Sequence, residues 1–367
     1  MKIKKILCVV GTRPEAIKMA PVILALKDQE WAEVQVLATA QHREMLDQVL
    51  SIFDIKPNYD LDIMQAGQNL TDLTARLLMA MDKVLEQASP DIVLAQGDTT
   101  TVMVTSLACF YRKIPMGHVE AGLRTGDIAN PYPEEMNRVV AGRLSTLHFA
   151  PTESSSKNLL LENIPESSVH VTGNTVIDAL LMTAEKEINL GIDLDESKRL
   201  ILMTSHRREN FGAPMRESFE AIRYLVENNE DVELLYPVHP NPNVLEAVDD
   251  ILAGHPRIKL VKPMEYAVFV QAMKRAYFII SDSGGVQEEA PALGKPVLVL
   301  RNETERPEAV DAGVVKLVGT DRELIIAEAE KLLHNPGDYK KMAKGVSPYG
   351  DGNAAKRIVG ILYDWFH

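Results

Sequence analysis

The sequence is poor in cysteine and in positive charge, and both shortages exclude kinds of protein. Its two cysteines among 367 residues, Cys8 and Cys109, lie far apart inside apolar runs, so they provide neither a disulfide framework nor a zinc-ligand spacing. The formal net charge of −13 argues against a nucleic-acid partner, which requires a basic face. An anionic small ligand stays open, because it requires only a few well-placed cations.

Long hydrophobic runs are also missing. The first apolar run, Ile6 to Val10, has five residues and ends at Gly11. A secretory signal needs about 7–15 apolar residues and a membrane-spanning helix about 20. We therefore expect a cytoplasmic protein with no membrane partner.

The sequence does contain an alternation of short apolar runs and amphipathic stretches, which is typical of doubly wound parallel α/β domains. At about 150 residues per domain, 367 residues predict two of them, with a hinge near Gly173. The predicted strands are Ile6–Val10, Val34–Ala38, Ile92–Ala95, Ile114–Val119, Leu147–Ala150, Val169–Thr172, Leu200–Thr204, Val232–Val238, Ile258–Val261, Phe278–Ser281, Val297–Leu300 and Val314–Val318. The predicted helices of the first half, with the final one, are Pro14–Gln29, Arg43–Phe53, Leu70–Gln87, Thr99–Arg112, Glu134–Leu144 and Asn353–Phe366.

The loop after the first predicted strand begins Gly11-Thr12-Arg13-Pro14 and continues to Lys18. A helix that starts there would attract an anion to its N-terminus, with Arg13 and Lys18 adding positive charge. A capped turn with solvated cations explains the same residues equally well. The loop is not a Walker A motif, and the chain contains no GxGxxG fingerprint.

Three acidic residues, Asp98, Glu120 and Glu134, follow or adjoin the ends of predicted strands. Each has an ordinary structural explanation: Asp98 as a helix cap, and ion pairs of Glu120 with Arg124 and of Glu134 with Arg138. Together they are more specific, because strand ends converge on one cleft, where paired acid–base catalysts must meet.

The second half supplies cations and a glycine turn. His206 and Arg207 follow a strand, in a pattern that favours phosphate. His239 lies in a proline-rich loop and is weak evidence alone. Ser283-Gly284-Gly285 joins a strand to a helix and leaves backbone N–H groups that would fit a nucleotide diphosphate, while the following acids, Glu288 and Glu289, suit ribose hydroxyls.

These motifs resemble the non-hydrolysing UDP-N-acetylglucosamine 2-epimerase family, in one order from residue 11 to about 310. The matching segments are GTRPEAIKMAP (11–21), AQHREMLDQ (40–48), QGDTTT (96–101), HVEAGLRT (118–125), PYPEEMNR (131–138), SHRREN (205–210), PVHPNP (237–242), SDSGGVQEEAP (281–291) and RNETERPE (301–308).

The resemblance implies the α/β GT-B fold: two Rossmann-like doubly wound domains with the active site in the cleft between them. We expect an N-terminal domain over 1–172 with the catalytic acids, a UDP-binding domain over 173–352, and a final helix over 353–367 that packs back on the first domain. The implied catalytic residues are Asp98, Glu120, Glu134 and His206. The implied substrate-binding residues are Arg13, Lys18, Arg138, Arg207, His239, Phe269, Ser283, Gly284, Gly285 and Glu289.

The implied reaction is the reversible conversion of UDP-N-acetylglucosamine to UDP-N-acetylmannosamine by a homodimer. The C2 proton of the sugar is not acidic, so the enzyme must either oxidise C3 with a nicotinamide or eliminate UDP across C1–C2 and add it back to the glycal. The first route requires a dinucleotide fingerprint, which is missing, and the second requires carboxylates and cations, which are present. We therefore expect no cofactor, and no metal either, since arginines and a helix N-terminus can hold the diphosphate.

Several alternatives stay open on sequence. A hydrolysing 2-epimerase would share the motifs and release UDP and N-acetylmannosamine, and another relative would act on a UDP-diacetamido sugar. A GT-B glycosyltransferase is less favoured, because retaining transfer does not need three carboxylates at this position. A nucleotide-sugar sensor without catalysis is the non-enzyme alternative.

Some bacterial members of the family bind a second UDP-N-acetylglucosamine as an activator, at positions matched here by Gln41, His42 and Gln68. Glu44 stands where those members tend to carry Gln, and Gly67 where they tend to carry Arg. Losing a cation and gaining an anion weakens the attraction for a diphosphate. The sequence therefore predicts a weakened or absent activator site.

Overall fold

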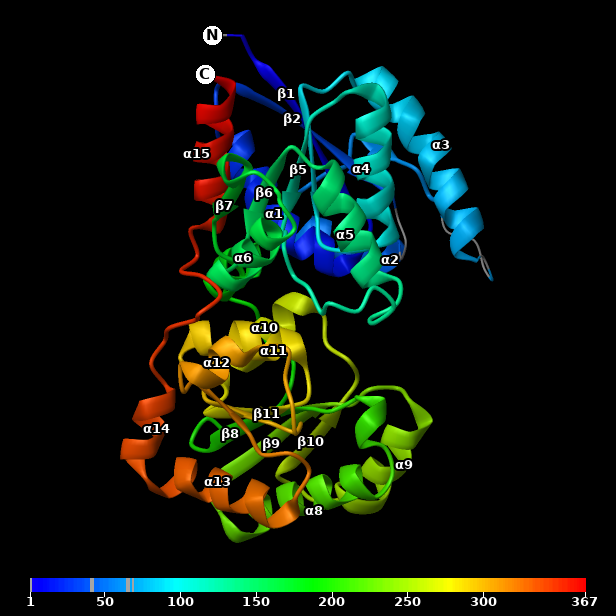
Figure 1. The fold of residues 1–367 in the computed structure, drawn as a ribbon. Helices are drawn as coiled ribbons and strands as arrows, with labels where there is room; N and C mark the ends of the chain where they lie inside the picture. The colour runs from blue at the N-terminus through cyan, green and yellow to red at the C-terminus, as the bar shows by residue number, and fades with distance from the viewer. Residues whose placement is uncertain (1, 40–42, 64–66, 68) are drawn as a thin grey trace. The chain divides into compact units, whose positions relative to one another are not determined.

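The computed structural model describes residues 2–39, 43–63, 67 and 69–367. The chain divides into unit 1, made of Met1–Ala179 and Tyr349–His367, and unit 2, made of Leu180–Pro348. Each unit is a parallel β-sheet with helices on both faces (Figure 1). This arrangement confirms the predicted class of two doubly wound α/β domains. In the described part of the chain, no helix combines the length and the apolar character needed to span a bilayer.

The sheet of unit 1 has seven parallel strands in the order β3-β2-β1-β4-β5-β6-β7. They are β1 (Lys4–Val10), β2 (Ala32–Ala38), β3 (Tyr59–Asp60), β4 (Ile92–Gln96), β5 (Met116–Val119), β6 (Leu147–Ala150) and β7 (Val169–Val171). The central strands are buried along their length, which explains their continuous apolar runs. Since β1 lies between β2 and β4, the order of connection reverses at β1–β4.

Helices cover both faces of this sheet. They are α1 (Arg13–Lys27), α2 (Arg43–Ile52), α3 (Leu70–Ala88), α4 (Thr100–Arg112), α5 (Glu134–Leu144), α6 (Glu153–Leu161) and α15 (Ala354–Phe366), with a 3₁₀ turn over Glu166–Ser168. Helix α7 (Thr175–Ala184) begins in unit 1 and ends in unit 2. One layer contains α3, α4 and α5, which contact one another in turn, and the other contains α2, α1 and α15 (Figure 1). The buried faces of α3 and α4 pack on β1 and β4 through Leu7, Met81 and Val102.

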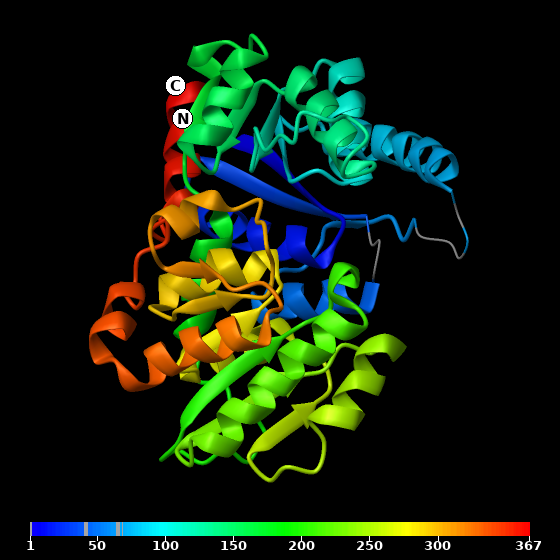
Figure 2. The same cartoon turned by 60° about the horizontal axis from the view of Figure 1, so that its bottom comes forward.

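The final helix, α15, belongs to unit 1 and packs on α1. Ile358 and Leu362 are fully buried, which is worth about 1.5–3 kcal/mol for each side chain. The Tyr363 ring meets Trp31 edge-on at 5.7 Å. Both ends of the chain therefore lie at the same end of unit 1 (Figures 1 and 2), where the Lys4 ammonium lies over the Phe366 ring.

Unit 2 contains a six-stranded parallel sheet in the order β10-β9-β8-β11-β12-β13. The strands are β8 (Arg199–Thr204), β9 (Val232–Pro237), β10 (Ile258–Val261), β11 (Phe278–Ser281), β12 (Val297–Val299) and β13 (Val315–Leu317). The helices are α8 (Ala213–Asn228), α9 (Pro242–Ile251), α10 (Tyr266–Arg275), α11 (Gly284–Glu289), α12 (Pro307–Asp311), α13 (Arg322–His334) and α14 (Pro336–Met342), with 3₁₀ turns over Arg208–Asn210 and Ala290–Leu293.

The core of unit 2 lies between its sheet and the layer formed by α8, α9 and α13 (Figure 1). Phe219 of α8 packs edge-on against Tyr236 of β9, with ring centroids 5.8 Å apart, and both side chains are fully buried. The Tyr236 hydroxyl donates a hydrogen bond to the Ser205 carbonyl, so this large side chain buries no unsatisfied polar group. The core thereby supports the loop that follows β8.

Candidate active site

The carboxyl ends of three neighbouring strands in unit 1 carry polar loops. Gly11 follows β1, Asp98 lies two residues after β4, and Glu120 follows β5, and the three strands are adjacent in the sheet. Open parallel sheets bind ligands at this edge, beside the point where the strand order reverses. Asp98 and Glu120 are therefore brought to the edge at which a ligand is expected.

Glu120 is a buried carboxylate that the described residues Lys18, Asn174 and Gln96 hold. Its side chain is 8% exposed, its Oε1 lies 2.5 Å from Lys18 Nζ and accepts from Asn174 Nδ2 at 2.8 Å, and its Oε2 accepts from Gln96. Its backbone has φ of 63°, a conformation that residues other than glycine adopt rarely and that is common at functional sites. The alternative pairing with Arg124 is wrong, because Arg124 binds Glu162 in a two-bond fork at 2.6 and 2.9 Å.

Asp98 has a different environment. Burial raises the pKa of its carboxyl, the nearby Arg138 opposes this, and the charge of Glu120 adds to the increase. Arg138 Nη2 lies 2.8 Å from Asp98 Oδ2, and the Asn137 amide donates to the Asp98 carbonyl at 2.9 Å. Asp98 does not cap α4, whose N-cap residue is Thr99. The helix-cap explanation of Asp98 is therefore wrong, and its carboxyl and carbonyl are both engaged by α5.

Glu134 begins α5 and is partly buried. Its charge contributes to the raised pKa of Asp98, which places the two carboxyls in one electrostatic field. The local pairing of Glu134 with Arg138 is also wrong, since Arg138 instead binds Asp98 and lies 3.2 Å from Glu135. Because Asp98 follows the end of β4, its pairing with Arg138 directs the arginine side chain away from the surface and toward the strand ends.

The loop after β1 is organised by a buried glutamate. Glu15 Oε2 accepts from the amides of Gly11 and Thr12 at 2.5 and 2.9 Å, and its Oε1 accepts from the Thr99 hydroxyl at 2.5 Å. Burial raises the pKa of Glu15 to about 7. The loop amides that were predicted to attract an anion are thus already engaged, Arg13 is exposed at the start of α1, and Lys18 reaches Glu120.

A buried histidine supports the turn that carries Asp98. His118 of β5 approaches the Gly97 carbonyl through Nε2 at 2.7 Å, and burial lowers its pKa to about 4. A neutral imidazole must donate from Nε2 to make this bond. Gly97 has φ of 90°, which favours glycine, so the turn is set both by residue type and by this contact.

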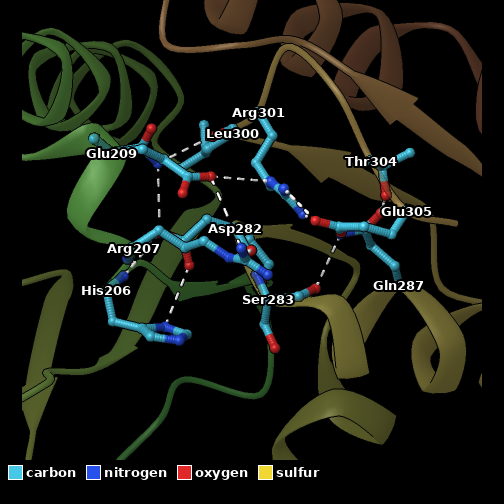
Figure 3. A network of polar contacts seen from close by, with 12 residues as sticks. His206, Arg207, Glu209, Asp282, Ser283, Gln287, Leu300, Arg301, Thr304 and Glu305 are labelled. Atoms are coloured by element: carbon cyan, nitrogen blue, oxygen red, sulfur yellow. Dashed lines mark hydrogen bonds and ion pairs between the residues drawn. The ribbon is translucent and has the colours of Figure 1, made fainter. Parts of the chain in front are cut away.

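In unit 2, the loops after β8 and β11 meet at Asp282 (Figure 3). Asp282 is fully buried, and its Oδ2 accepts from the amides of His206 and Arg207 at 2.8 and 2.9 Å. Burial by itself would raise the pKa of Asp282, but the His206 ring and the two amides together lower it. His206 in turn stacks on His239, with ring centroids 5.5 Å apart.

The glycine turn after β11 lies against an arginine that the sequence analysis did not select. A Cβ on Gly284 would come within 2.6 Å of the Arg306 guanidinium, so the absence of a side chain lets this cation approach the backbone. Arg306 Nε donates to Glu288 Oε1 at 2.6 Å. Ser283 precedes α11, and Gly284 and Gly285 form its first two residues.

The remaining candidates in unit 2 lie on α10 and α11. Tyr266 donates its hydroxyl to Glu289 Oε1 at 2.9 Å, and burial together with the Glu289 charge raises the tyrosine pKa. Phe269 follows on α10 and is half-buried. Glu288 and Glu289, which were expected to suit ribose hydroxyls, thus already have an arginine and a tyrosine as partners.

Gln41, His42 and Gln68, the candidates for an activator site, lie outside the described residues. Elsewhere the structure adds polar residues that the motifs did not single out for a role. These are Gln96, Asn174, Asp282, Arg306 and Glu15. Asp282 follows a strand end, so the rule that selected Asp98 also applied to it. Across residues 2–39, 43–63, 67 and 69–367, no three His, Cys, Asp or Glu side chains gather as a metal site would require.

The fold and these polar groups define a GT-B-type protein with carboxylates at strand ends in one unit and an imidazole, arginines and a glycine turn in the other. The family model of UDP-N-acetylglucosamine 2-epimerase matches residues 24–363. The UDP-N-acetylglucosamine 2-epimerase of Salmonella typhimurium is 51% identical over 368 residues, covering 98% of each chain. The chain therefore belongs to the UDP-N-acetylglucosamine 2-epimerase family, as the sequence resemblance predicted.

Solved structures agree with this assignment. The crystal structure of UDP-GlcNAc 2-epimerase from Neisseria meningitidis bound to UDP-GlcNAc is 50% identical, with a TM-score of 0.87, and the match covers 98% of this chain and 100% of that one. A glycotransferase of kitacinnamycin has a TM-score of 0.66 at 12% identity, covering 99% of each chain. That second likeness shows a shared fold alone.

Proposed function

We propose that this chain interconverts UDP-N-acetylglucosamine and UDP-N-acetylmannosamine without hydrolysis, by eliminating UDP and adding it back through a glycal. Membership of the family supports the substrate, as does the relative from Neisseria meningitidis with bound UDP-GlcNAc. The single observation that carries the mechanism is the placement of Asp98 and Glu120 at adjacent strand ends in contrasting environments. Catalytic acids and bases are recognised by such pairs of titratable groups.

In the proposed reaction, the C2–H and C1–O bonds break and a C1=C2 double bond forms. The C2 proton passes to a carboxylate, and the bonding electrons of C1–O leave with the diphosphate of UDP. Re-addition reverses these steps, with a proton delivered to the opposite face of C2. Asp98, Glu120 and Glu134 act as one coupled set, in which the raised pKa of Asp98 favours its protonated form and hence proton delivery.

The departing diphosphate requires cations and hydrogen-bond donors. We assign this role to Arg306 and Arg207, with the amides of Gly284 and Gly285 approached closely because they carry no Cβ. We assign to His206 the donation of a proton to the same diphosphate. Because these groups stabilise charge that grows as C1–O breaks, they lower the barrier more than they strengthen ground-state binding.

Incubating the chain with UDP-N-acetylglucosamine in D₂O and following the proton NMR spectrum tests the proposal. We expect the manno isomer with deuterium at C2, and small amounts of free UDP and glycal. Stoichiometric release of UDP with N-acetylmannosamine would instead identify a hydrolysing enzyme. A chain that binds the substrate and leaves it unchanged would contradict catalysis altogether. Glu30→Gln, which changes an exposed carboxylate remote in sequence from the motifs, is the matched control.

We also propose that the chain acts as a homodimer, as the family resemblance implies. Light scattering coupled to size-exclusion chromatography measures the mass directly. We expect twice the 40.7 kDa of one chain, and a mass of 40.7 kDa would contradict the proposal.

A further inference from the structure

Asp282 has one carboxylate oxygen committed to the backbone and one left for a side chain. Oδ2 accepts from the His206 and Arg207 amides and from the Ser205 hydroxyl at 3.2 Å. These contacts hold the carboxylate against the loop after β8, and the Asp282 carbonyl accepts from Arg207 Nε at 3.2 Å. The carboxylate is therefore fixed in position before any ligand arrives.

The other oxygen, Oδ1, is fully buried, and within the described residues no hydrogen bond of ordinary geometry reaches it. Its neighbour is His206 Nδ1, at 3.3 Å (Figure 3). A buried acceptor without a partner is costly, and hydrogen bonds at reactive groups are often long until a ligand is bound. Oδ1 is thus aimed at the imidazole ring, which is itself 42% exposed at the side chain.

We propose that Asp282 is the positioning residue of His206: it keeps the proton of the neutral imidazole on Nδ1 and directs Nε2 away from the loop toward the ligand. This inference deepens the proposed function and rests on it only for the role of His206 in catalysis. Asp282 itself touches no reacting atom. It acts through the ring, as the buried carboxylate does in acid–base triads that orient a histidine.

Burial opposes ionisation of Asp282, but its contacts with the His206 ring and the two amides outweigh this and lower the pKa of its carboxyl. His239 stacks on the ring, Arg207 binds the Asp282 carbonyl, and Tyr236 donates to the Ser205 carbonyl beneath the loop. Burial and the charge of Asp282 both raise the pKa of Tyr236. One contact further out, Glu209 lies 3.9 Å from Arg207 and 3.2 Å from Arg301.

The first test needs no substitution. In the native chain labelled with ¹⁵N-histidine, long-range nitrogen–proton NMR reports which ring nitrogen carries the proton, with assignment by loss of the signal in His206→Gln. We expect the neutral His206 ring to carry its proton on Nδ1. A proton on Nε2 would overturn the proposal, whether or not the chain shows epimerase activity.

The second test compares Asp282→Asn with Glu233→Gln. Glu233 is also a buried carboxylate of unit 2, but it lies near the start of β9, where it accepts from the Asp195 amide at 3.0 Å. In Asp282→Asn, the neutral amide no longer holds the ring proton on Nδ1, so part of the His206 signal should report the Nε2 tautomer and turnover should fall by roughly 10²-fold. Glu233→Gln should lower melting temperature without moving either quantity.

The tautomer and the UDP affinity together separate positioning from a merely structural role. Asp282→Asn should change the tautomer of His206 and lower turnover, while the affinity for UDP measured by calorimetry changes little. An unchanged His206 tautomer in a folded Asp282→Asn variant would refute the proposal. If that variant fails to fold, the tautomer found in the native chain decides.

Discussion

In unit 1 two of the candidate carboxylates, Asp98 and Glu120, lie against cations, whereas in unit 2 the candidate imidazole lies against a carboxylate. Asp98 and His206 share one feature: each is more exposed than its partner, with side-chain exposures of 33% against 12% for Arg138 and 42% against 0% for Asp282. Glu120 shows the opposite relation, at 8% against 18% for Lys18. In the Asp98 and His206 pairs, the candidate group is thus the more exposed member and its counter-charge the more buried one, whereas in the Glu120 pair the candidate carboxylate is the more buried member.

Removing the carboxylates of unit 1 should have the largest effect. Asp98→Asn, Glu120→Gln and Glu134→Gln should each lower turnover by roughly 10²–10⁴-fold, with a modest change in melting temperature. Lys18 is partly exposed, so it can turn to solvent when Glu120 is neutralised. Turnover by NMR and melting by calorimetry, measured on the same samples, check this.

The matched control is Glu162→Gln, which removes a carboxylate of unit 1 that binds Arg124. It should affect stability alone. Near-normal turnover in the folded fraction of the three acid variants would assign them a structural role.

A second prediction concerns the pH dependence of stability. Two buried groups of unit 1, His118 and Glu15, change the free energy of unfolding in opposite directions as the pH rises. The pKa of His118 is lowered to about 4, so its contribution to stability is complete above the ordinary value near 6.5 and is lost as pH falls toward 4. The pKa of Glu15 is raised to about 7, so the folded state holds its proton and loses stability as pH rises from about 4.5 through 7.

We compare the free energy of unfolding of Glu15→Gln with that of the native chain. The difference in favour of Glu15→Gln should grow by about 2–3 kcal/mol as the pH rises from 5 to 8. Urea unfolding followed by tryptophan fluorescence measures this in the relevant unit, because Trp31 and Trp365 both belong to unit 1. Glu30→Gln serves as the exposed control, with no expected pH dependence. If the difference in unfolding free energy between Glu15→Gln and the native chain were the same at both pH values, Glu15 would already be ionised in the folded state.

In unit 2, Gly284→Val should displace the Arg306 guanidinium, which lies 2.6 Å from the position of the new Cβ. We expect the affinity for UDP to fall by about tenfold or more, equivalent to about 1.4 kcal/mol, while the fold survives. Calorimetric titration with UDP measures the loss. Gly360→Ala, where a Cβ meets nothing within 4 Å, is the control. Unchanged binding in Gly284→Val would refute the placement of the diphosphate.

The smallest expected effect belongs to Asn174→Ala. This change removes the Asn174 donor to Glu120 and should lower turnover roughly threefold to tenfold, less than a full hydrogen bond to a charged group, since the contacts with Gln96 and Lys18 remain. The exposed Asn228, which donates to the Tyr224 carbonyl of its own helix, is the control when changed to Ala. A loss as large as that of Glu120→Gln would show that Asn174 itself takes part in the chemistry.

Much of the fold was predictable because buried parallel strands require continuous apolar runs. The runs at Ile6 and Ile92 became β1 and β4, and the positions after them became the candidate site. The strand β3 was not predicted, since two residues carry no recognisable pattern. Strand-end rules need only the chain order, which explains why they located Asp98 and Glu120.

Partners of charged groups were the part that sequence could not supply. The rule for residues four apart paired Glu134 with Arg138, yet Arg138 reaches Asp98, 40 residues away in the chain. Lys18 and Glu120 are separated by 102 positions. Such contacts depend on which strands become neighbours, and nothing local in the chain encodes that.

The two stretches of chain that link the units run side by side inside unit 1. The backbone N–H of Asn174 donates to the Tyr349 carbonyl at 2.6 Å. The Asp178 carboxylate accepts from the first two backbone amides of α15, which has no side-chain cap from its own N-cap residue. Unit 2 is therefore an insertion within unit 1. During synthesis, α1 must leave its apolar face uncovered until α15 emerges from the ribosome after the whole of unit 2. The unit that is translated first is thus the one that finishes folding last.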